Sequence, residues 1–162
     1  MDALPKRESL GEQLPVDQSS ANILVVDDDR KFLLAMEALL SGPDRVIFKA
    51  ASGYEALRYV LKQSFALILL DIRMPEMDGF ETASLIRTRN QSKDTPIIFI
   101  SGVDTLESDV AKGFSQGGFD YIFKPIIPHV LKSKVAVFVE DFYQCERMKQ
   151  QALQQVLKEI KR

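Results

Sequence analysis

Residues 67–79 read Leu-Ile-Leu-Leu-Asp-Ile-Arg-Met-Pro-Glu-Met-Asp-Gly. An apolar run that suits a fully buried strand ends abruptly at the carboxylate of Asp71. A turn with Pro75 and the pair Asp78-Gly79 follows, and a helical pattern begins after it. The carboxyl edge of a parallel sheet is where α/β folds bind ligands. Taken alone, the stretch leaves open whether Asp71 has such a role or only caps the next helix and solvates the turn.

Strands of the same kind recur on both sides of this stretch, and helical patterns separate them. The expected strands are residues 22–26, 46–50, 67–70, 97–100 and 120–123. The expected helices are residues 30–41, a segment after the N-cap Ser52, a segment from Phe80 onward, and residues 106–116. This alternation predicts a doubly wound parallel α/β sheet.

In the helix after Ser52, apolar spacing indicates one inward face, made of Tyr54, Leu57, Val60 and Leu61. Residues 1–21 mix charged residues, proline, glycine and serine without periodicity, so we expect a disordered leader there.

Composition narrows the possible functions. The chain of 162 residues has a formal net charge of -2, so no basic excess points to nucleic acid or to an anionic membrane. A single cysteine, Cys145, and a single histidine, His129, exclude an intrachain disulfide and a cysteine or histidine metal cluster. The sequence has no signal-like N-terminus and no apolar run of about 20 residues. We therefore expect a soluble, cytoplasmic protein without membrane insertion and without a nucleic-acid partner.

Polar side chains stand at the carboxyl ends of four expected strands. Asp27 and Asp28 follow the first strand, Asp71 the third, Ser101 the fourth and Lys124 the fifth. The second strand ends in alanines. In the flavodoxin-like order 2-1-3-4-5 the four loaded strands are neighbours and the empty one lies at the far edge. This order would bring three carboxylates, a hydroxyl and an ammonium group to one edge of the sheet.

These residue types together predict phosphoryl chemistry with a metal ion. Clustered carboxylates cannot all stay ionised without a cation, and hard oxygen ligands suit Mg²⁺ or Mn²⁺. A carboxylate can act as a nucleophile and form an aspartyl phosphate. The metal, the Lys124 ammonium and the Ser101 hydroxyl are groups that can neutralise charge on the transferred phosphoryl oxygens.

Four motifs carry a family resemblance. They are Val-Val-Asp-Asp at 25–28, Leu-Asp-Ile-Arg-Met-Pro-Glu-Met-Asp-Gly at 70–79, Phe-Ile-Ser-Gly at 99–102 and Tyr-Ile-Phe-Lys-Pro at 121–125. Together, in this order and spacing, they resemble the receiver domains of bacterial two-component response regulators, over about residues 22–138. The resemblance implies a phosphoprotein that takes part in phosphorelay signal transduction.

The resemblance also implies roles at the phosphoacceptor site. Asp71 would accept the phosphoryl group from a histidine kinase or phosphotransfer protein. Asp28 and Asp71 would bind Mg²⁺ with the backbone carbonyl of Arg73, and Asp27 would act mainly through water. Ser101 would contact the phosphoryl group.

Further roles fall on the fifth strand. Lys124 would pair with the phosphoryl group, and the Lys124–Pro125 bond would be cis. Tyr121 would be the aromatic switch residue, whose ring turns as Ser101 moves toward the phosphoryl group. The alternative for Tyr121 is an ordinary half-buried strand residue.

A helical pattern continues from about His129 to Arg162, far longer than the sheet needs. Its apolar residues follow a 4-3-4-3 spacing at Leu131, Val135, Phe138, Phe142 and Cys145. The phase slips at Lys149, and Leu153, Val156 and Ile160 resume it. We expect residues 139–162 to extend from the receiver as a homodimeric coiled coil. The alternative is an amphipathic tail that frays when it is alone.

The favoured function is a signalling switch that relays its phosphorylation state through the C-terminal helix. It would not be an enzyme, apart from its own phosphorylation and dephosphorylation at Asp71. An Asp-nucleophile phosphatase would need a second Asp two residues after the first, and Arg73 stands there. Two further functions stay open at this point: a dimeric scaffold that is not phosphorylated, and the N-terminal module of a larger kinase, sensory or cyclase protein.

Overall fold

The computed structural model describes residues 20–102, 107–115 and 120–161. Its centre is a five-stranded parallel sheet in the order β2-β1-β3-β4-β5, as expected. The strands are β1 (Ala21–Val26), β2 (Arg45–Ala50), β3 (Leu67–Asp71), β4 (Ile97–Ser101) and β5 (Asp120–Phe123). Each expected strand agrees with the structure to within one residue at either end.

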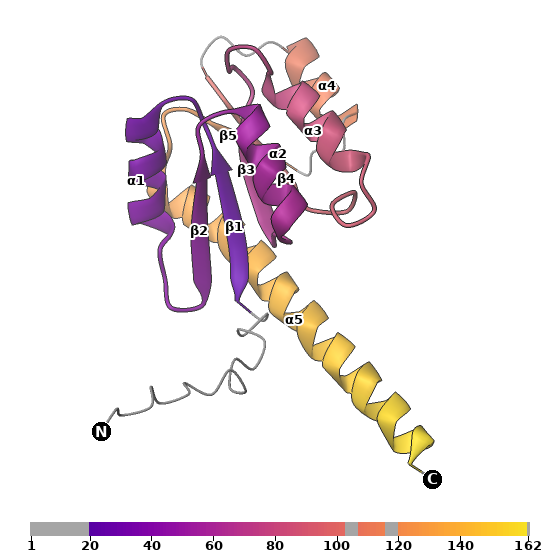
Figure 1. Cartoon of the computed structure of the whole chain (residues 1–162). Helices are drawn as coiled ribbons and strands as arrows, with labels where there is room; N and C mark the ends of the chain where they lie inside the picture. Colours follow the sequence, from indigo (N-terminus) through magenta and orange to yellow (C-terminus); the bar gives the residue numbers. More distant parts are fainter. Residues whose placement is uncertain (1–19, 103–106, 116–119, 162) are drawn as a thin grey trace, which may run out of the picture.

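Helices cover both faces of the sheet (Figure 1). They are α1 (Arg30–Leu40), α2 (Gly53–Lys62), α3 (Gly79–Arg87), α4 (Glu107–Ser115) and α5 (Pro128–Ile160). One apolar core lies between the sheet and α1 with α5, and a second lies between the sheet and α2 with α3. The ends expected for the fourth helix, Leu106 and Gln116, lie outside the described residues, as do residues 1–19 of the expected leader.

The register of the sheet brings the carboxyl ends of the strands level. Val26 of β1 lies beside Leu70 of β3, and Asp71 lies beside Ile100 of β4. Ser101, the last residue of β4, lies beside Phe123 of β5. The residues that follow these ends therefore share one edge, and the alanine end of β2 lies beside β1 at the margin of the sheet.

The inward face of α2 differs from the expected one. Tyr54 and Leu61 are 52% and 59% exposed, whereas the small residue Ala56 is fully buried beside Val60. The helix packs so closely on α3 that a Cβ atom on Gly53 would lie 2.3 Å from the hydroxyl oxygen of Thr82. A close helix contact needs small residues on the inner face, and Tyr54 and Leu61 point outward, whereas Leu57 and Val60 face the core as expected. The expected N-cap is confirmed, since the Ser52 side chain accepts a hydrogen bond from the Glu55 N–H.

Only the N-terminal part of the long helix α5 packs against the sheet and α1. Leu131, Val135 and Val139 are buried in the core beside α1, and Phe138 and Phe142 pack partly buried against it. Every residue from 147 to 160 is exposed, and this part projects away from the sheet (Figure 1). Within the described part of the chain, no helix is long and apolar enough to cross a membrane.

Candidate functional site

Three carboxylates meet at the carboxyl edge of the sheet. Asp27 and Asp28 follow β1, and Asp71 is the last residue of β3. One carboxylate oxygen from each lies within 4.8 Å of the others. Asp27 and Asp71 are almost fully buried, while Asp28 is exposed to solvent. The cluster is thus reached from one side.

Two neighbouring aspartates have structural tasks instead. Asp29 caps α1, because its carboxylate accepts hydrogen bonds from the N–H groups of Lys31 and Phe32. Asp78 caps α3 and accepts from the Glu81 N–H at 2.9 Å. Since Asp78 fills this position, Asp71 is not the cap of the helix that follows it.

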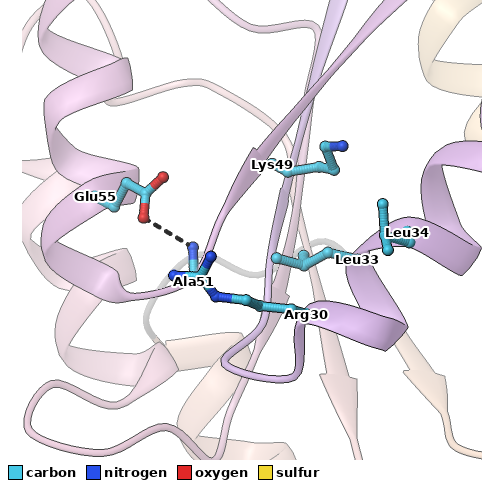
Figure 2. Close-up of a pocket in the computed structure, with 6 residues that line it drawn as sticks. All are labelled: Arg30, Leu33, Leu34, Lys49, Ala51 and Glu55. Atoms are coloured by element: carbon cyan, nitrogen blue, oxygen red, sulfur yellow. Dashed lines mark hydrogen bonds between the residues drawn. The ribbon is translucent and has the colours of Figure 1, made fainter.

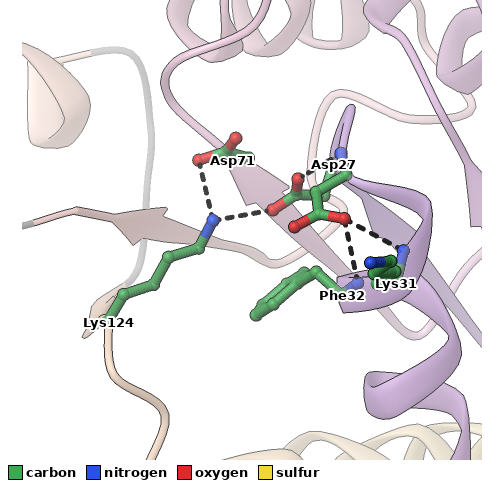
Figure 3. Close-up of polar contacts among 6 residues, drawn as sticks. Asp27, Lys31, Phe32, Asp71 and Lys124 are labelled. Carbon is green, nitrogen blue, oxygen red and sulfur yellow. Dashed lines mark hydrogen bonds and ion pairs between the residues drawn. The ribbon is translucent and has the colours of Figure 1, made fainter.

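Lys124 is the cation of the cluster. Its Nζ donates to Asp27 Oδ2 at 3.0 Å and lies 4.0 Å from Asp71 Oδ1 (Figure 3). The ammonium also lies 4.4 Å from the centre of the Phe32 ring. Burial would lower the pKa of Lys124, but the hydrogen bond to Asp27 and the charges of Asp71 and Asp27 outweigh it and raise that pKa. Lys124 therefore stays charged at the site.

One ammonium group does not balance three carboxylates. Burial, followed by the charge of Asp27, raises the pKa of Asp71 to about 7. Burial also raises the pKa of Asp27, although its hydrogen bonds with Asp29 and Lys124 act in the opposite direction. A further cation beside these oxygens would stabilise the ionised carboxylates. The donor set of hard carboxylate oxygens fits Mg²⁺ or Mn²⁺.

The loop after β3 folds back on the phosphoacceptor candidate. The Gly79 N–H donates to the Ile72 carbonyl at 2.9 Å. A Cβ atom on Gly79 would lie only 2.3 Å from the Asp71 carbonyl oxygen. Glycine at this position therefore lets the start of α3 approach the strand end and fixes the backbone that carries Asp71.

Ser101 offers a buried hydroxyl that nothing in the described part of the chain satisfies. The residue is fully buried, and its Oγ has no hydrogen-bond partner there. An unpaired buried hydroxyl costs about 1–3 kcal/mol. Its backbone carbonyl accepts from the Lys124 N–H at 2.8 Å, so the two residues are held next to each other. The hydroxyl is suited to a ligand oxygen that would satisfy it.

Tyr121 is buried with its hydroxyl engaged. The hydroxyl oxygen lies 2.8 Å from the Asp109 carbonyl and 3.0 Å from the Val110 carbonyl, so it donates to α4. Its ring packs on Phe99, with ring centres 5.6 Å apart. Burial raises the pKa of Tyr121. Tyr121 is therefore buried and not half-buried, and its hydroxyl ties β5 to α4.

Sequence reasoning missed Asp109. Its carboxylate forms an ion pair with Arg73 at 2.9 Å, and its carbonyl is the acceptor for Tyr121. No motif surrounds Asp109 in the sequence, and the two paired residues are 36 positions apart. The Lys124–Pro125 bond is cis, as the resemblance implies.

A separate hollow of about 270 Å³ opens beside the empty end of β2 (Figure 2). It lies between α1 and α2, and its walls combine apolar and basic side chains. The lining residues are Arg30, Leu33, Leu34, Lys49, Ala51 and Glu55. Glu55 accepts a hydrogen bond from the Ala51 N–H at 3.2 Å. The hollow includes none of the three clustered aspartates, so it is not the site described above.

Comparison with known proteins shows the family of the chain. A family model for the response regulator receiver domain matches residues 23–136. A probable cyclic di-GMP phosphodiesterase of Vibrio cholerae is 37% identical over 126 residues, which are 77% of this chain and 28% of that protein. The transcriptional regulatory protein SrrA of Staphylococcus aureus is 34% identical over 116 residues, 72% of this chain and 46% of that protein.

A solved structure is similar over a larger share of this chain than either relative. The crystal structure of an adenylate cyclase from Rhodopirellula baltica superposes with a TM-score of 0.69 and 26% identity, over 83% of this chain and 98% of that one. The chain spans less than half the length of these two curated relatives. With the aspartate cluster, the buried serine and the lysine at one sheet edge, this chain belongs to the response regulator receiver domain family of two-component signalling.

Proposed function

We propose that this chain is a phosphorylation-dependent switch in which Asp71 accepts a phosphoryl group from the phosphohistidine of a histidine kinase or phosphotransfer protein. The observation that carries the proposal is the setting of Asp71. Its carboxylate stands at a strand end, is released from capping α3 by Asp78, and lies 4.0 Å from the Lys124 ammonium.

The transfer step follows from this setting. A carboxylate oxygen of Asp71 attacks phosphorus, the phosphorus–nitrogen bond to the donor histidine breaks, and the electron pair of that bond leaves with the imidazole nitrogen. The product is an aspartyl phosphate. The attacking carboxylate must be ionised. With a pKa of about 7, much of Asp71 would be protonated at neutral pH in the metal-free protein.

Two side chains serve the phosphoryl group directly. Lys124 lies close enough to Asp71 to pair with phosphoryl oxygens, since its Nζ already bridges Asp27 and Asp71. The Ser101 hydroxyl, which is buried without a partner among the described residues, would donate to a phosphoryl oxygen. Both contacts stabilise negative charge on the oxygens of the transferred group.

The metal site is part of the proposal. Asp27, Asp28 and Asp71, with the backbone carbonyl of Arg73, would hold Mg²⁺ or Mn²⁺. A bound ion would supply positive charge that ionises Asp71 and neutralises phosphoryl oxygens. The support for this site is that oxygens of all three aspartates lie within 4.8 Å of one another.

Phosphorylation can be tested with a small phosphodonor. The full chain is incubated with Mg²⁺ and acetyl phosphate and analysed by intact-mass spectrometry, where we expect the addition of one phosphoryl group. Asp71→Asn should abolish the adduct. Asp141→Asn, which changes an exposed aspartate on α5, should retain it. Equal phosphorylation of Asp71→Asn would overturn the assignment of the phosphoacceptor.

The output of the switch is proposed to pass through α5 into a homodimeric coiled coil. The projecting part of the helix presents apolar side chains that the receiver does not cover. They are Met148, Leu153, Val156, Leu157 and Ile160, all at least 48% exposed. A second copy of the same helix offers a matching apolar stripe, and packing the two together would remove both from water.

Cys145 provides a test of the dimer, because it lies exposed on α5 where the helix leaves the domain. A parallel pair in register would bring two Cys145 side chains together, so mild oxidation should give a disulfide dimer. Sedimentation should show a dimer of the unoxidised chain. Leu153→Glu combined with Ile160→Glu should make it monomeric, whereas Gln151→Glu combined with Lys158→Glu should not. A monomeric wild-type chain without cross-linking would remove the dimer and leave the phosphoacceptor proposal standing.

The activity of the chain itself would be limited to its own phosphorylation and dephosphorylation. The two relatives named above are described by different activities, one as a probable phosphodiesterase and one as a transcriptional regulatory protein. The chain matches only 28% and 46% of their lengths. What these relatives share with the chain is the receiver. Loss of the phosphoryl group over time, followed by mass spectrometry after the donor is removed, would measure the self-dephosphorylation.

A further inference from the structure

An ion pair joins the loop after the phosphoacceptor to the first turn of α4. The guanidinium of Arg73 donates to Asp109 Oδ2 at 2.9 Å. The Arg73 side chain is 55% exposed, and the Asp109 side chain is 18% exposed. The ion pair therefore connects the solvent-exposed loop after β3 to the first turn of α4.

The other end of Arg73 touches Asp71. Its backbone N–H donates a hydrogen bond to the Asp71 carboxylate, which lowers the pKa of that group. The same residue is thus held by the phosphoacceptor through its backbone and by α4 through its side chain.

The other end of Asp109 touches Tyr121. The Asp109 carbonyl accepts the Tyr121 hydroxyl at 2.8 Å, and this hydroxyl also reaches Val110. Further along α4, a Cβ atom on Gly113 would lie 1.7 Å from the same hydroxyl, so the helix backbone rests against the tyrosine. The first turn of α4 is therefore held from one side by Arg73 and from the other by the buried ring of Tyr121.

We propose that Asp109 is a positioning residue, which through its ion pair with Arg73 holds the guanidinium away from Asp71 and keeps α4 and Tyr121 in the resting arrangement. This inference rests on the proposed phosphorylation of Asp71. A phosphoryl group there brings close to two negative charges within two residues of Arg73. These charges compete with Asp109 for the guanidinium, and loss of the ion pair frees the turn that accepts the Tyr121 hydroxyl.

Coupling of this kind is reciprocal. If a group on Asp71 weakens the ion pair, then removing the ion pair must favour binding of that group. An ion pair with an exposed arginine is weak, so the expected gain in affinity is about two- to five-fold. Beryllium fluoride with Mg²⁺ is a suitable probe, because it mimics a phosphoryl group on a carboxylate without a covalent step.

The experiment compares the wild-type chain of 162 residues with Asp109→Asn, Asp109→Glu and a matched control. Binding of beryllium fluoride in Mg²⁺ is titrated by amide NMR. We expect Asp109→Asn to bind about two- to five-fold more tightly, and Asp109→Glu to stay near the wild type because it keeps the charge. The control is Glu81→Gln, which removes one exposed carboxylate near the start of α3, where the structure records no ion pair for it among the described residues.

A second readout needs neither metal nor probe. In the metal-free protein, amide exchange at residues 109–113 should be faster in Asp109→Asn than in Glu81→Gln. Arg73→Ala should speed the same amides, and the double variant should add little, because either change removes the same contact.

The outcomes separate the two proposals. If the wild type fails to bind beryllium fluoride at Asp71, both the proposed function and this inference fail. If the wild type binds but Asp109→Asn does so with unchanged affinity, the inference alone is overturned. Fully additive effects of Arg73→Ala and Asp109→Asn on amide exchange would overturn it as well.

Discussion

Gly79 lies so close to the backbone of Asp71 that a Cβ atom on Gly79 would lie 2.3 Å from the Asp71 carbonyl oxygen. Gly79 is the first residue of α3, where alanine would otherwise favour the helix. We expect Gly79→Ala to lower the free energy of unfolding by about 1–3 kcal/mol, because strand end and helix must move apart. Urea denaturation gives the value.

Gly42→Ala is the control for this change. A Cβ atom there would lie 3.3 Å from a carboxylate oxygen of Asp44, an exposed side chain that can turn away. Its effect should be much smaller than that of Gly79→Ala. Similar losses in the two variants would show that the contact with Asp71 is not what requires glycine.

The raised pKa of Asp71 makes stability depend on pH. In the metal-free protein this pKa is about 7, above the ordinary carboxyl value of 3.8. The unfolded chain releases the proton at lower pH than the folded protein does, so this group lowers folded stability as pH rises from about 4 to about 7. Asp71→Asn lacks the titration and should gain on the wild type by up to about 4 kcal/mol at pH 8, with the gain vanishing near pH 4.

This pH dependence is measured by urea unfolding in the presence of a chelator, from pH 4 to pH 8. Asp141→Asn, the exposed control on α5, should keep a constant difference from the wild type. A difference for Asp71→Asn that stays flat over the whole range would contradict the prediction.

Replacing the buried Ser101 by alanine should not lower the free energy of unfolding. Its buried hydroxyl has no partner in the described part of the chain, so Ser101→Ala removes an unsatisfied group and no hydrogen bond. Stability of the unphosphorylated protein should stay level or rise by up to about 1 kcal/mol. Phosphorylation by acetyl phosphate should slow, because a donor to the phosphoryl oxygens is lost.

Ser92→Ala is the matched control for Ser101→Ala. Ser92 is also buried, but its hydroxyl donates to the Ile86 carbonyl at 2.6 Å. Its removal should cost about 1 kcal/mol of stability and leave the phosphorylation rate unchanged. Destabilisation of Ser101→Ala as large as that of Ser92→Ala would show that Ser101 is satisfied in solution.

The fold and the composition of the site could be predicted because strand ends are marked in the sequence. Buried strands such as β3 are continuous apolar runs, and Asp71 breaks the run at the point where the strand reaches the edge of the sheet. The order 2-1-3-4-5 is expected because it is a common order of doubly wound sheets, and it makes the four strands with polar ends neighbours. The structure has this order.

Other features could not be predicted, for physical reasons. The prediction for the inner face of α2 holds for Leu57 and Val60 and is wrong for Tyr54 and Leu61. The short distance between α2 and α3, and not apolar spacing, decides that the small residue Ala56 is buried there. The pair of Arg73 and Asp109 depends on how α4 is placed against β3, and two single charges 36 residues apart leave no pattern. The hydrogen bonds of Tyr143 could not be predicted either. The apolar spacing of α5 passes through its neighbour Phe142 and assigns no contact to Tyr143.

Tyr143 marks the point where α5 leaves the domain. Its hydroxyl donates to the Asp44 carbonyl before β2 and lies 3.4 Å from the Ala21 N–H at the start of β1. These contacts lie at the edge of the sheet opposite the aspartate cluster, and beyond residue 146 the helix is exposed throughout its described length. We expect Tyr143→Phe to cost about 1–2 kcal/mol of stability, because the hydroxyl takes part in two hydrogen bonds.

The effect should be local to the helix exit. Amide exchange should speed up in α5 from residue 139 onward and stay unchanged in β3 and β4, because the ring remains to pack on Phe142. Phosphorylation of Asp71 by acetyl phosphate should proceed at the wild-type rate. Tyr54→Phe serves as the control, since Tyr54 is 52% exposed on α2. Equal exchange in α5 of the two variants would mean that the Tyr143 hydroxyl does not fix the place where the helix leaves the receiver.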